Sequence, residues 1–160
     1  MSRSIICSFL LLLSLSLYGC GSEGIINPFS GSVWEVGNNN ISFSHAVADW
    51  DTANNRINLK FDLITGASYP DAIASVEEVS TLTVNNAREV NVVVSIADGR
   101  TYACDPSNPD SNATVIFSRL DLNPLGGVSG RIDGMVQRVE DINEPPVELH
   151  ATFESVPVTN

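Results

Sequence analysis

The residues of this chain that could take part in chemistry are few and stand apart. His45 and His150 are the two histidines, and each lies alone in a stretch of alternating polar and apolar residues. A zinc site needs several His, Cys or carboxylate ligands at convergent positions, and neither histidine has such neighbours in the sequence. The Gly-x-Ser-x-Gly motif of the α/β-hydrolases is also absent. We therefore expect no catalytic residue, no histidine-bound metal and no cofactor.

Acidic and amide side chains are concentrated in three segments that are predicted to be loops, residues 49–55, 105–112 and 140–144. Calcium takes six to eight oxygen ligands, and the second segment offers four candidates: Asp105, Asn108, Asp110 and Asn112. Their spacing does not follow the EF-hand pattern, and Asp and Asn are also common turn formers. We expect solvated turns, and a calcium site is the alternative.

The N-terminal segment has the order of residues that is typical of a secretory signal peptide. Arg3 precedes an apolar run over residues 5–17. As a helix this run would be roughly 20 Å long, whereas a hydrocarbon core is about 30 Å thick. The run therefore indicates a cleavable signal and not a membrane span.

The run ends in Leu17-Tyr18-Gly19-Cys20, which resembles the lipobox of bacterial lipoproteins. The resemblance implies cleavage between Gly19 and Cys20, a lipid on the Cys20 sulfur and acylation of the new N-terminus. Gly21, in place of the aspartate that retains such proteins in the inner membrane, favours the outer membrane in an organism with two membranes. One acyl chain alone binds a membrane only marginally, and the two or three chains of the family would make the attachment permanent. The alternative is an ordinary secretory signal, in which Cys20 follows the signal by chance.

The composition predicts a single acidic domain built from strands. The chain has 160 residues, of which 43% are hydrophobic and 17% charged, with eight Lys and Arg against 19 Asp and Glu. This apolar content excludes general disorder, and the acidic charge argues against nucleic acid as a partner. Residues 20–160 would carry a formal charge of −12 and contain 17 Val and ten Ile but only seven Leu. Residues that branch at Cβ favour strands.

Hydrophobic periodicity places the expected elements in the first half of the chain. Residues 41–50 and 57–63 alternate polar and apolar side chains and predict a hairpin about a turn at residues 51–55. Residues 66–79 are the one helical candidate, since Pro70 suits a first turn and Ser68 and Asp71 have capping-box spacing; a strand is the alternative. Asp98-Gly99 is the pair that a two-residue type I′ hairpin prefers.

Residues 113–122, 128–136 and 147–154 read as further strands. The sequence thus predicts an all-β fold of seven to nine strands, with at most one short helix near residues 70–79. An antiparallel β-sandwich is the expected architecture, and a closed β-barrel is the alternative. Residues 1–19 would be the lipoprotein signal peptide, residues 20–32 the lipidated cysteine and a flexible tether, and residues 33–160 the single β domain.

A second resemblance concerns the C-terminal strands. Residues 127–136, with Gly127, Gly130 and Gly134 among Val and Ile, and the alternating Val147, Leu149 and Phe153 resemble the closing strands of uncharacterised β-sandwich surface lipoproteins of bacteria. Ile132 stands where that family usually has an aromatic residue. The resemblance implies a fold and an envelope location but no active site.

The three cysteines have different expected fates under the lipobox interpretation. Cys7 is removed with the signal and Cys20 is lipidated, which leaves Cys104 as a lone thiol and excludes a disulfide within the mature chain. We expect Cys104 to be a small buried hydrophobe, and a thiol exposed for pairing between molecules is the alternative. The aromatic residues Trp34, Trp50 and Tyr69 are expected to belong to the core or its rim rather than to a ligand patch.

Together these features predict a lipid-anchored protein of the bacterial cell envelope. We expect a non-enzymatic interaction or structural module, attached to the membrane through Cys20, whose acidic loops could receive a basic envelope protein. The alternative is a β-barrel lipoprotein that binds a small ligand such as a lipid or a glycan. An envelope hydrolase would require a nucleophile, a base and an orienting group in one cleft.

Overall fold

A computed structural model of the chain describes residues 29, 31–63, 70–104 and 108–159. In these residues the fold is all β, with eleven strands, one short 3-10 helix and no α-helix. The elements are β1 (Gly31–Val36), β2 (Asn39–Phe43), β3 (His45–Asp51), β4 (Arg56–Asp62), β5 (Asp71–Val76), η1 (Val79–Thr81), β6 (Ala87–Glu89), β7 (Asn91–Ser95), β8 (Thr101–Ala103), β9 (Ala113–Leu120), β10 (Gly127–Arg138) and β11 (Val147–Thr159).

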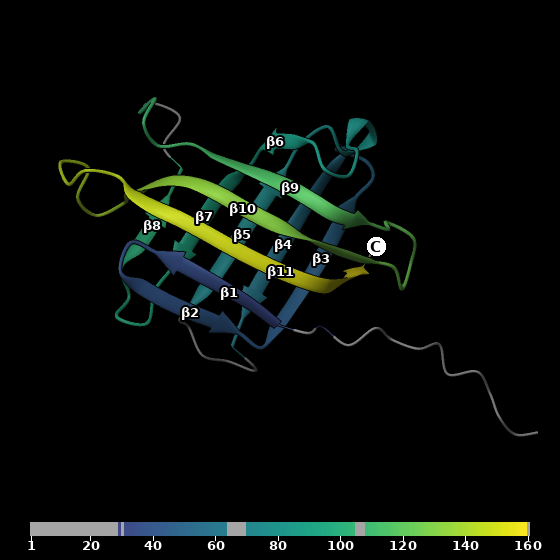
Figure 1. The fold of residues 1–160 in the computed structure, drawn as a ribbon, viewed down its shortest axis with the longest axis horizontal. Helices are drawn as coiled ribbons and strands as arrows, with labels where there is room; N and C mark the ends of the chain where they lie inside the picture. The colour runs from purple at the N-terminus through teal and green to yellow at the C-terminus, as the bar shows by residue number, and fades with distance from the viewer. Residues whose placement is uncertain (1–28, 30, 64–69, 105–107, 160) are drawn as a thin grey trace, which may run out of the picture.

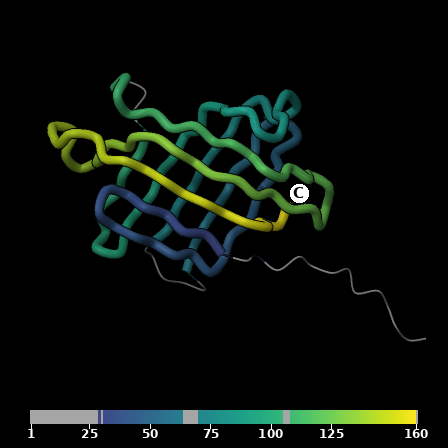
Figure 2. Tube along the Cα trace, in the orientation of Figure 1, coloured from purple at the N-terminus to yellow at the C-terminus, as the bar shows by residue number. Residues whose placement is uncertain are grey.

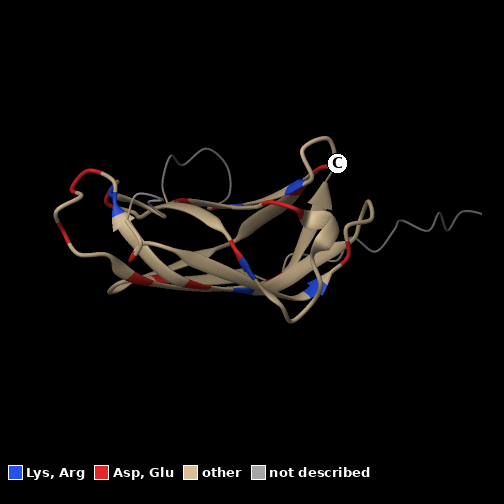
Figure 3. Ribbon diagram, turned by 90° about the horizontal axis from the view of Figure 1, so that it is seen from above, with Lys and Arg blue, Asp and Glu red and all other residues tan. Residues whose placement is uncertain are grey.

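The strands are arranged in two layers that lie one over the other (Figures 1 and 2). The front layer in Figure 1 has the order β2-β1-β11-β10-β9-β6, and the back layer has the order β3-β4-β5-β7-β8. Neighbouring strands are antiparallel, apart from a short parallel contact between β11 and β3. Seen from above, Lys, Arg, Asp and Glu occur on strands of both layers and in the loops (Figure 3).

The two longest strands belong to both layers. β10 pairs with β9 and β11 along most of its length, and with β8 at its end through Gln137 and Arg138. β11 pairs with β1 and β10, and its last residues, Val158 and Thr159, pair with β3. These contacts join the layers into one mixed sheet, in which the pairings β11-β3-β4-β5-β7-β8-β10 close a ring.

A chain of aromatic rings fills the centre of the space between the layers. Phe61 of β4, in the back layer, lies 5.1 Å from Trp34, 6.0 Å from Phe43 and 5.8 Å from Phe153 between ring centroids, and Phe117 lies 6.2 Å from Phe153. All five side chains are at most 2% exposed. Most of these contacts are edge-to-face, the geometry that aromatic pairs prefer. Phe61 is therefore the ring through which the two layers meet.

The glycines of β10 allow this strand to lie close to β9. A Cβ atom at Gly130 would collide with the carbonyl of Ile116 and the ring of Phe153, and one at Gly134 would collide with Ala113. The alternation of Gly with apolar residues in residues 127–136 therefore has a packing cause, which is the close approach of a neighbouring strand.

Of the two interpretations of residues 66–79, the helix is wrong and the strand is confirmed over the part that the structure describes. Asp71–Val76 is strand β5, in which Ala72, Ala74 and Val76 are buried and the residues between them face outward. The period is thus two, and tertiary burial between β4 and β7 overrides the helical spacing of Ile73, Val76 and Val79. A single 3-10 turn follows at Val79–Thr81.

The described residues hold eleven strands rather than the predicted seven to nine. One reason is that β1 begins at Gly31, within the predicted tether, and the other is that continuous runs are divided where the chain changes partner. The run over residues 41–50 bends at Ser44, so that β2 pairs with β1 while β3 pairs with β4. The β-rich segment over residues 88–96, which also predicts one continuous strand, divides at Val90 into β6, which pairs with β9, and β7, which pairs with β5. The hairpin about residues 51–55 is confirmed for β3 and β4.

The turn at Asp98-Gly99 also differs from the prediction. A type I′ turn would need positive φ at both central residues, but φ is positive at Gly99 (87°) and not at Asp98. The Gly99 N–H donates to the Ile96 carbonyl, and the Ile96 N–H donates to the Arg100 carbonyl. The connection is therefore a three-residue loop with Gly in the left-handed region.

We expect Phe61→Ala to lower the free energy of unfolding by about 3–5 kcal/mol, since it removes the ring that joins the layers and leaves a cavity. Denaturant unfolding followed by circular dichroism measures the change. Val33→Ala is the matched control: Val33 faces solvent from β1, and its truncation should cost no more than about 0.5 kcal/mol. Equal losses for the two variants would contradict the role given to Phe61.

Candidate functional site

Several residues that the sequence singles out lie outside the described residues. These are Gly19 and Cys20 of the predicted lipobox, Asp105 of the predicted calcium loop, and Tyr69. Lipidation of Cys20 therefore stays a prediction from the sequence. The remaining candidates are all described, and they lie at separate places in the fold.

Each histidine is paired with an aspartate on the neighbouring strand, on the outside of the molecule. His45 Nδ1 lies 2.9 Å from Asp62 Oδ1, across β3 and β4, and His150 Nδ1 lies 3.0 Å from Asp133 Oδ1, across β11 and β10. The two pairs belong to different layers, and all four side chains are about half exposed. No group of three His, Cys, Asp or Glu side chains that would suit a metal ion occurs in the described residues.

His150 lies among carboxylates on the outer face of the front layer. The strand register places it directly opposite Glu35 on one side and Asp133 on the other. The hydrogen bond to Asp133 is the main cause that raises the pKa of His150, and the charges of Asp133, Glu148 and Glu35 add to it against a desolvation that lowers it. Asp133 also binds Arg131, with Nε and Oδ2 3.1 Å apart.

The amides of the predicted calcium loop are used within the loop itself. Asn108 Oδ1 accepts a hydrogen bond from the Asp110 N–H, and Asn108 Nδ2 donates to Gln137 Oε1 at 3.2 Å. Asn112 Nδ2 donates to the Pro109 carbonyl. Gln137, which is buried, also donates to the Glu144 carbonyl at 2.6 Å, so this side chain connects two of the acidic loops. These contacts account for the Asn side chains as parts of a turn.

Cys104 is half buried, at the end of β8. Its Sγ donates a weak hydrogen bond to the Val90 carbonyl at 3.7 Å, and burial raises the pKa of the thiol. It lines an open depression of about 280 Å³ together with Glu89, Asn91 and Asn112. A raised pKa leaves the thiol protonated and a poor nucleophile. Among the tryptophans, Trp34 is fully buried and Trp50 packs partly buried against the core, as the sequence predicts.

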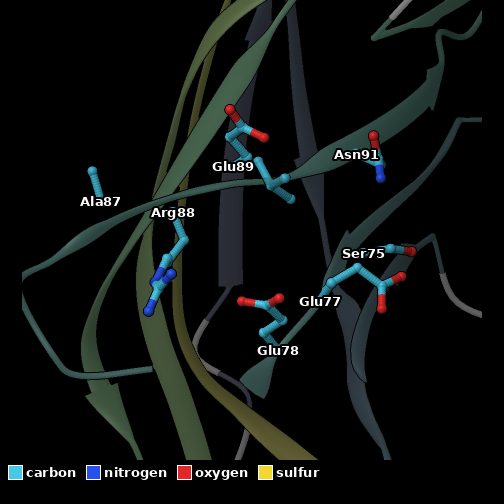
Figure 4. Close-up of a pocket in the computed structure, with 8 residues that line it drawn as sticks. Ser75, Glu77, Glu78, Ala87, Arg88, Glu89 and Asn91 are labelled. Carbon is cyan, nitrogen blue, oxygen red and sulfur yellow. The ribbon is translucent and has the colours of Figure 1, made fainter. Parts of the chain in front are cut away.

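A larger depression, of about 510 Å³, lies beside the first and was not foreseen from the sequence. Ser75, Glu77 and Glu78 line one side, at and beyond the end of β5, and the segment from Ala87 to Asn91 lines the other. Figure 4 shows these residues on two segments that face each other across the opening. Three carboxylates, those of Glu77, Glu78 and Glu89, lie around it.

Strand register explains why this opening exists. Ser75 is the last residue of β5 that pairs with β7, opposite Asn91. If the pairing continued in the same register, Glu77 would lie opposite Glu89, and like charges in directly opposed positions destabilise a sheet. The chain instead leaves the back layer at Val90, and β6 pairs with β9 of the front layer. The two strands therefore diverge beyond Ser75 and Asn91, and we call the opening between them the fork.

We expect Asp133→Asn to lower the pKa of His150, because it removes the hydrogen bond that contributes most to the raised value. NMR titration of the histidine ring protons measures this, and Asp62→Asn, at the other pair, is the matched control that should leave the pKa of His150 unchanged.

The raised pKa of His150 also predicts how the free energy of unfolding depends on pH. The pair stabilises the fold fully below the unfolded pKa of about 6.5, and this stabilisation is lost as pH rises through the pKa of His150 in the folded protein. Because both side chains are half exposed, the gain should stay under about 1 kcal/mol. A His150 titration that Asp133→Asn does not move would refute this account.

Comparison of the chain with protein-family models, with curated proteins and with solved structures finds no match. In the described part of the chain, no helix is long and apolar enough to cross a membrane. What the protein does therefore has to be inferred from its own residues and their arrangement.

Proposed function

We propose that this chain is a lipid-anchored protein of the bacterial cell envelope whose β domain serves as a non-enzymatic interaction module. Residues 1–19 act as the signal peptide, Cys20 carries the acyl chains, and residues 20–30 tether a domain that begins with β1 at Gly31. The outer membrane is the proposed location if the organism has two membranes. The lipobox resemblance of Leu17-Tyr18-Gly19-Cys20 supports the anchor, and the geometry of the domain supports its role.

The observation that carries the choice of an interaction module is the filled space between the layers. A β-barrel that carries a lipid or glycan keeps a cavity at its centre, but here the ring of Phe61, its three aromatic neighbours and Phe117 occupy that position. The two depressions described above lie at the surface and are open to solvent. The same filled core, together with the two layers in Figure 1, favours the β-sandwich over the closed barrel.

The distribution of reactive groups supports a role without catalysis. The pairs His45–Asp62 and His150–Asp133 lie on different layers, and Cys104 lies apart from both, next to the fork. Ser129, which stands in the Gly-rich segment, uses its Oγ to accept a hydrogen bond from the Ser155 N–H. A hydrolase needs nucleophile, base and orienting group within hydrogen-bond reach of one another, which these groups do not provide.

We expect Cys20→Ser to abolish membrane attachment when the full chain is produced in a bacterium. A radiolabelled fatty acid should be incorporated into the wild-type chain and not into the variant, because the thioether forms only on sulfur. Detergent phase partitioning should place the wild type in the detergent phase and the variant in the aqueous phase. Cys104→Ser is the matched control and should keep both properties. Labelling of the Cys20→Ser chain would rule out the anchor.

The interaction role is tested by crosslinking the lipidated chain in cells and identifying the products by mass spectrometry. We expect the products to contain an envelope protein, and the yield to fall at high salt if acidic surfaces make the contact. Native mass spectrometry of the same preparation tests the carrier alternative. A bound lipid or glycan without any crosslinked protein would favour the carrier and refute the interaction module.

A further inference from the structure

The fork has two strand edges that no strand in the described residues pairs with. β6 is the last strand of the front layer, so its outer edge has no neighbour. On the other side, β5 ends its pairing with β7 at Ser75, and the chain continues through Glu77 without a partner on that edge. Unpaired strand edges are templates for an added strand.

The direction of the backbone groups follows from the hydrogen bonds on either side of Val90. The Val90 N–H donates to the Ala113 carbonyl in β9, and Asn91 pairs with Ser75 of β5. Because successive backbone groups of a strand point to opposite sides, those of Glu89 and Ala87 point away from β9 and toward the fork. By the same alternation from Ser75, the backbone groups of Glu77 point into the fork from the other side.

The charges around the fork are mostly negative. Glu77, Glu78 and Glu89 line it, and among the described residues neither Glu78 nor Glu89 forms an ion pair with a cation. Arg88, the cation on β6, donates to the carbonyl and hydroxyl oxygens of Thr81 at 3.1 and 2.9 Å. Arg56 approaches Glu77 at 3.8 Å but is equally close to Asp51, so its charge is shared between two carboxylates.

We propose that the fork is the docking site of the interaction module, and that it takes an extended basic segment of a partner protein as an added strand. Backbone groups of the segment pair with the free edge of β6 at Ala87 and Glu89, and its Lys or Arg side chains reach Glu77, Glu78 and Glu89. If β5 and β7 had continued to pair, Glu77 and Glu89 would lie directly opposite each other. In the complex, the cations of the segment lie between these carboxylates instead.

The charge of the chain argues for a basic partner rather than a second copy of the same chain. The full sequence has a formal charge of −11, so two copies repel each other. At the fork itself, a second β6 edge would bring a second Glu89 against the first. A basic segment meets complementary charge on approach, which raises the association rate and favours the correct partner.

The probe is a short acetylated peptide of alternating Lys and Thr, with a peptide of alternating Glu and Thr as its counterpart, added to the purified full chain. We expect the Lys peptide to bind and the Glu peptide not to bind, with the affinity falling as ionic strength rises from about 0.05 to about 0.5 M. Amide hydrogen exchange read by NMR should show new protection at Ala87 and Glu89 only with the Lys peptide. Binding without protection at β6, or a dimer of the chain in place of a peptide complex, would overturn the proposal.

The carboxylates are tested by Glu77→Gln, Glu78→Gln and Glu89→Gln. Each should weaken binding of the Lys peptide about two- to fivefold, which is the range for exposed charge pairs, and the triple variant should weaken it more than any single one. Glu148→Gln, on the exposed face of β11, removes the same charge elsewhere and is the matched control. Equal weakening by Glu148→Gln would mean nonspecific attraction and would count against the fork.

The backbone contact is tested separately by Ala87→Pro. The Ala87 N–H points toward the fork and not toward β9, and Pro is accepted at the first residue of an edge strand. The variant should keep the fold and lose at least half of the affinity for the peptide, while Ala87→Val, which keeps the N–H, should retain it. If Ala87→Pro unfolds, the hydrogen-exchange protection of the wild-type amides at β6 still decides.

This inference rests on the proposed interaction role. If the Lys peptide does not bind but envelope proteins are still crosslinked, the fork alone is refuted. If Cys20 carries no lipid, the anchor alone is refuted.

Discussion

The pairing of β10 with β11 is the contact on which both layers depend. These strands have 12 and 13 residues, and each begins in one layer and ends against the other. To turn in this way they need local irregularity, which the register shifts at Ser129 and Gly130 supply. Opposite the shift, Ser155 has φ 54° and its N–H donates to Ser129 Oγ at 2.9 Å. A bulge bends a strand and increases its twist, so this short region directs β11 toward β3.

The opposite side of the molecule has no such closing pair. There the three-residue strand β6 pairs with β9, and the chain then crosses at Val90 into β7 of the back layer. The Val90 side chain is buried at this crossing. Acidic residues on both edges disfavour pairing of these edges with each other and with a second copy of the same acidic edge, as charged residues do at many strand edges. The same charges that protect the edges against self-association make them attractive to a cationic strand. Protection and recognition thus follow from one set of side chains.

The sequence predicted the fold class because the buried face of most strands follows a period of two. β4 and the first part of β11 show this alternation clearly, and the structure buries the expected side chains. It failed at β5, where the small residues Ala72 and Ala74 give a weak hydrophobic signal and the apolar residues Ile73, Val76 and Val79 repeat at helical spacing. The breaks at Ser44 and Val90 were missed for a different reason: they depend on which strand is the next neighbour, and that is set by contacts far along the chain.

The fork could not be read from the sequence for the same reason. Glu77 and Glu89 are 12 residues apart, and only the register between β5 and β7 reveals that they would face each other. A local signal existed in the Val-rich segment over residues 90–94, which follows the charged residues Arg88 and Glu89 and indicates an exposed strand end. That signal alone predicts a charged strand end, however, and does not reveal that the chain at Glu77 lies across from it. The predicted calcium loop is the opposite case. Asp and Asn residues that form turns can be recognised locally in the sequence, whether or not they bind an ion.

The position of the fork in the front layer fits the proposed attachment to a membrane. Along the order β1-β11-β10-β9-β6, four strand spacings separate β1 from β6, which is about 19 Å at the usual spacing. The chain enters the domain at Gly31 of β1, and the 11 residues from Cys20 to this point can reach at most about 40 Å. A lipid on Cys20, as proposed, would keep the domain within about 40 Å of the bilayer. β6, one side of the fork, lies across the central strands of the layer from β1 (Figure 1). An edge placed in this way stays accessible to a protein in the aqueous space, and its negative charge keeps it away from an anionic lipid surface. Because this reach exceeds the distance of about 19 Å between β1 and β6, the proposed tether does not fix the orientation of the domain. In the proposal, the acidic charge of the edge is what turns it toward a basic segment in the aqueous space.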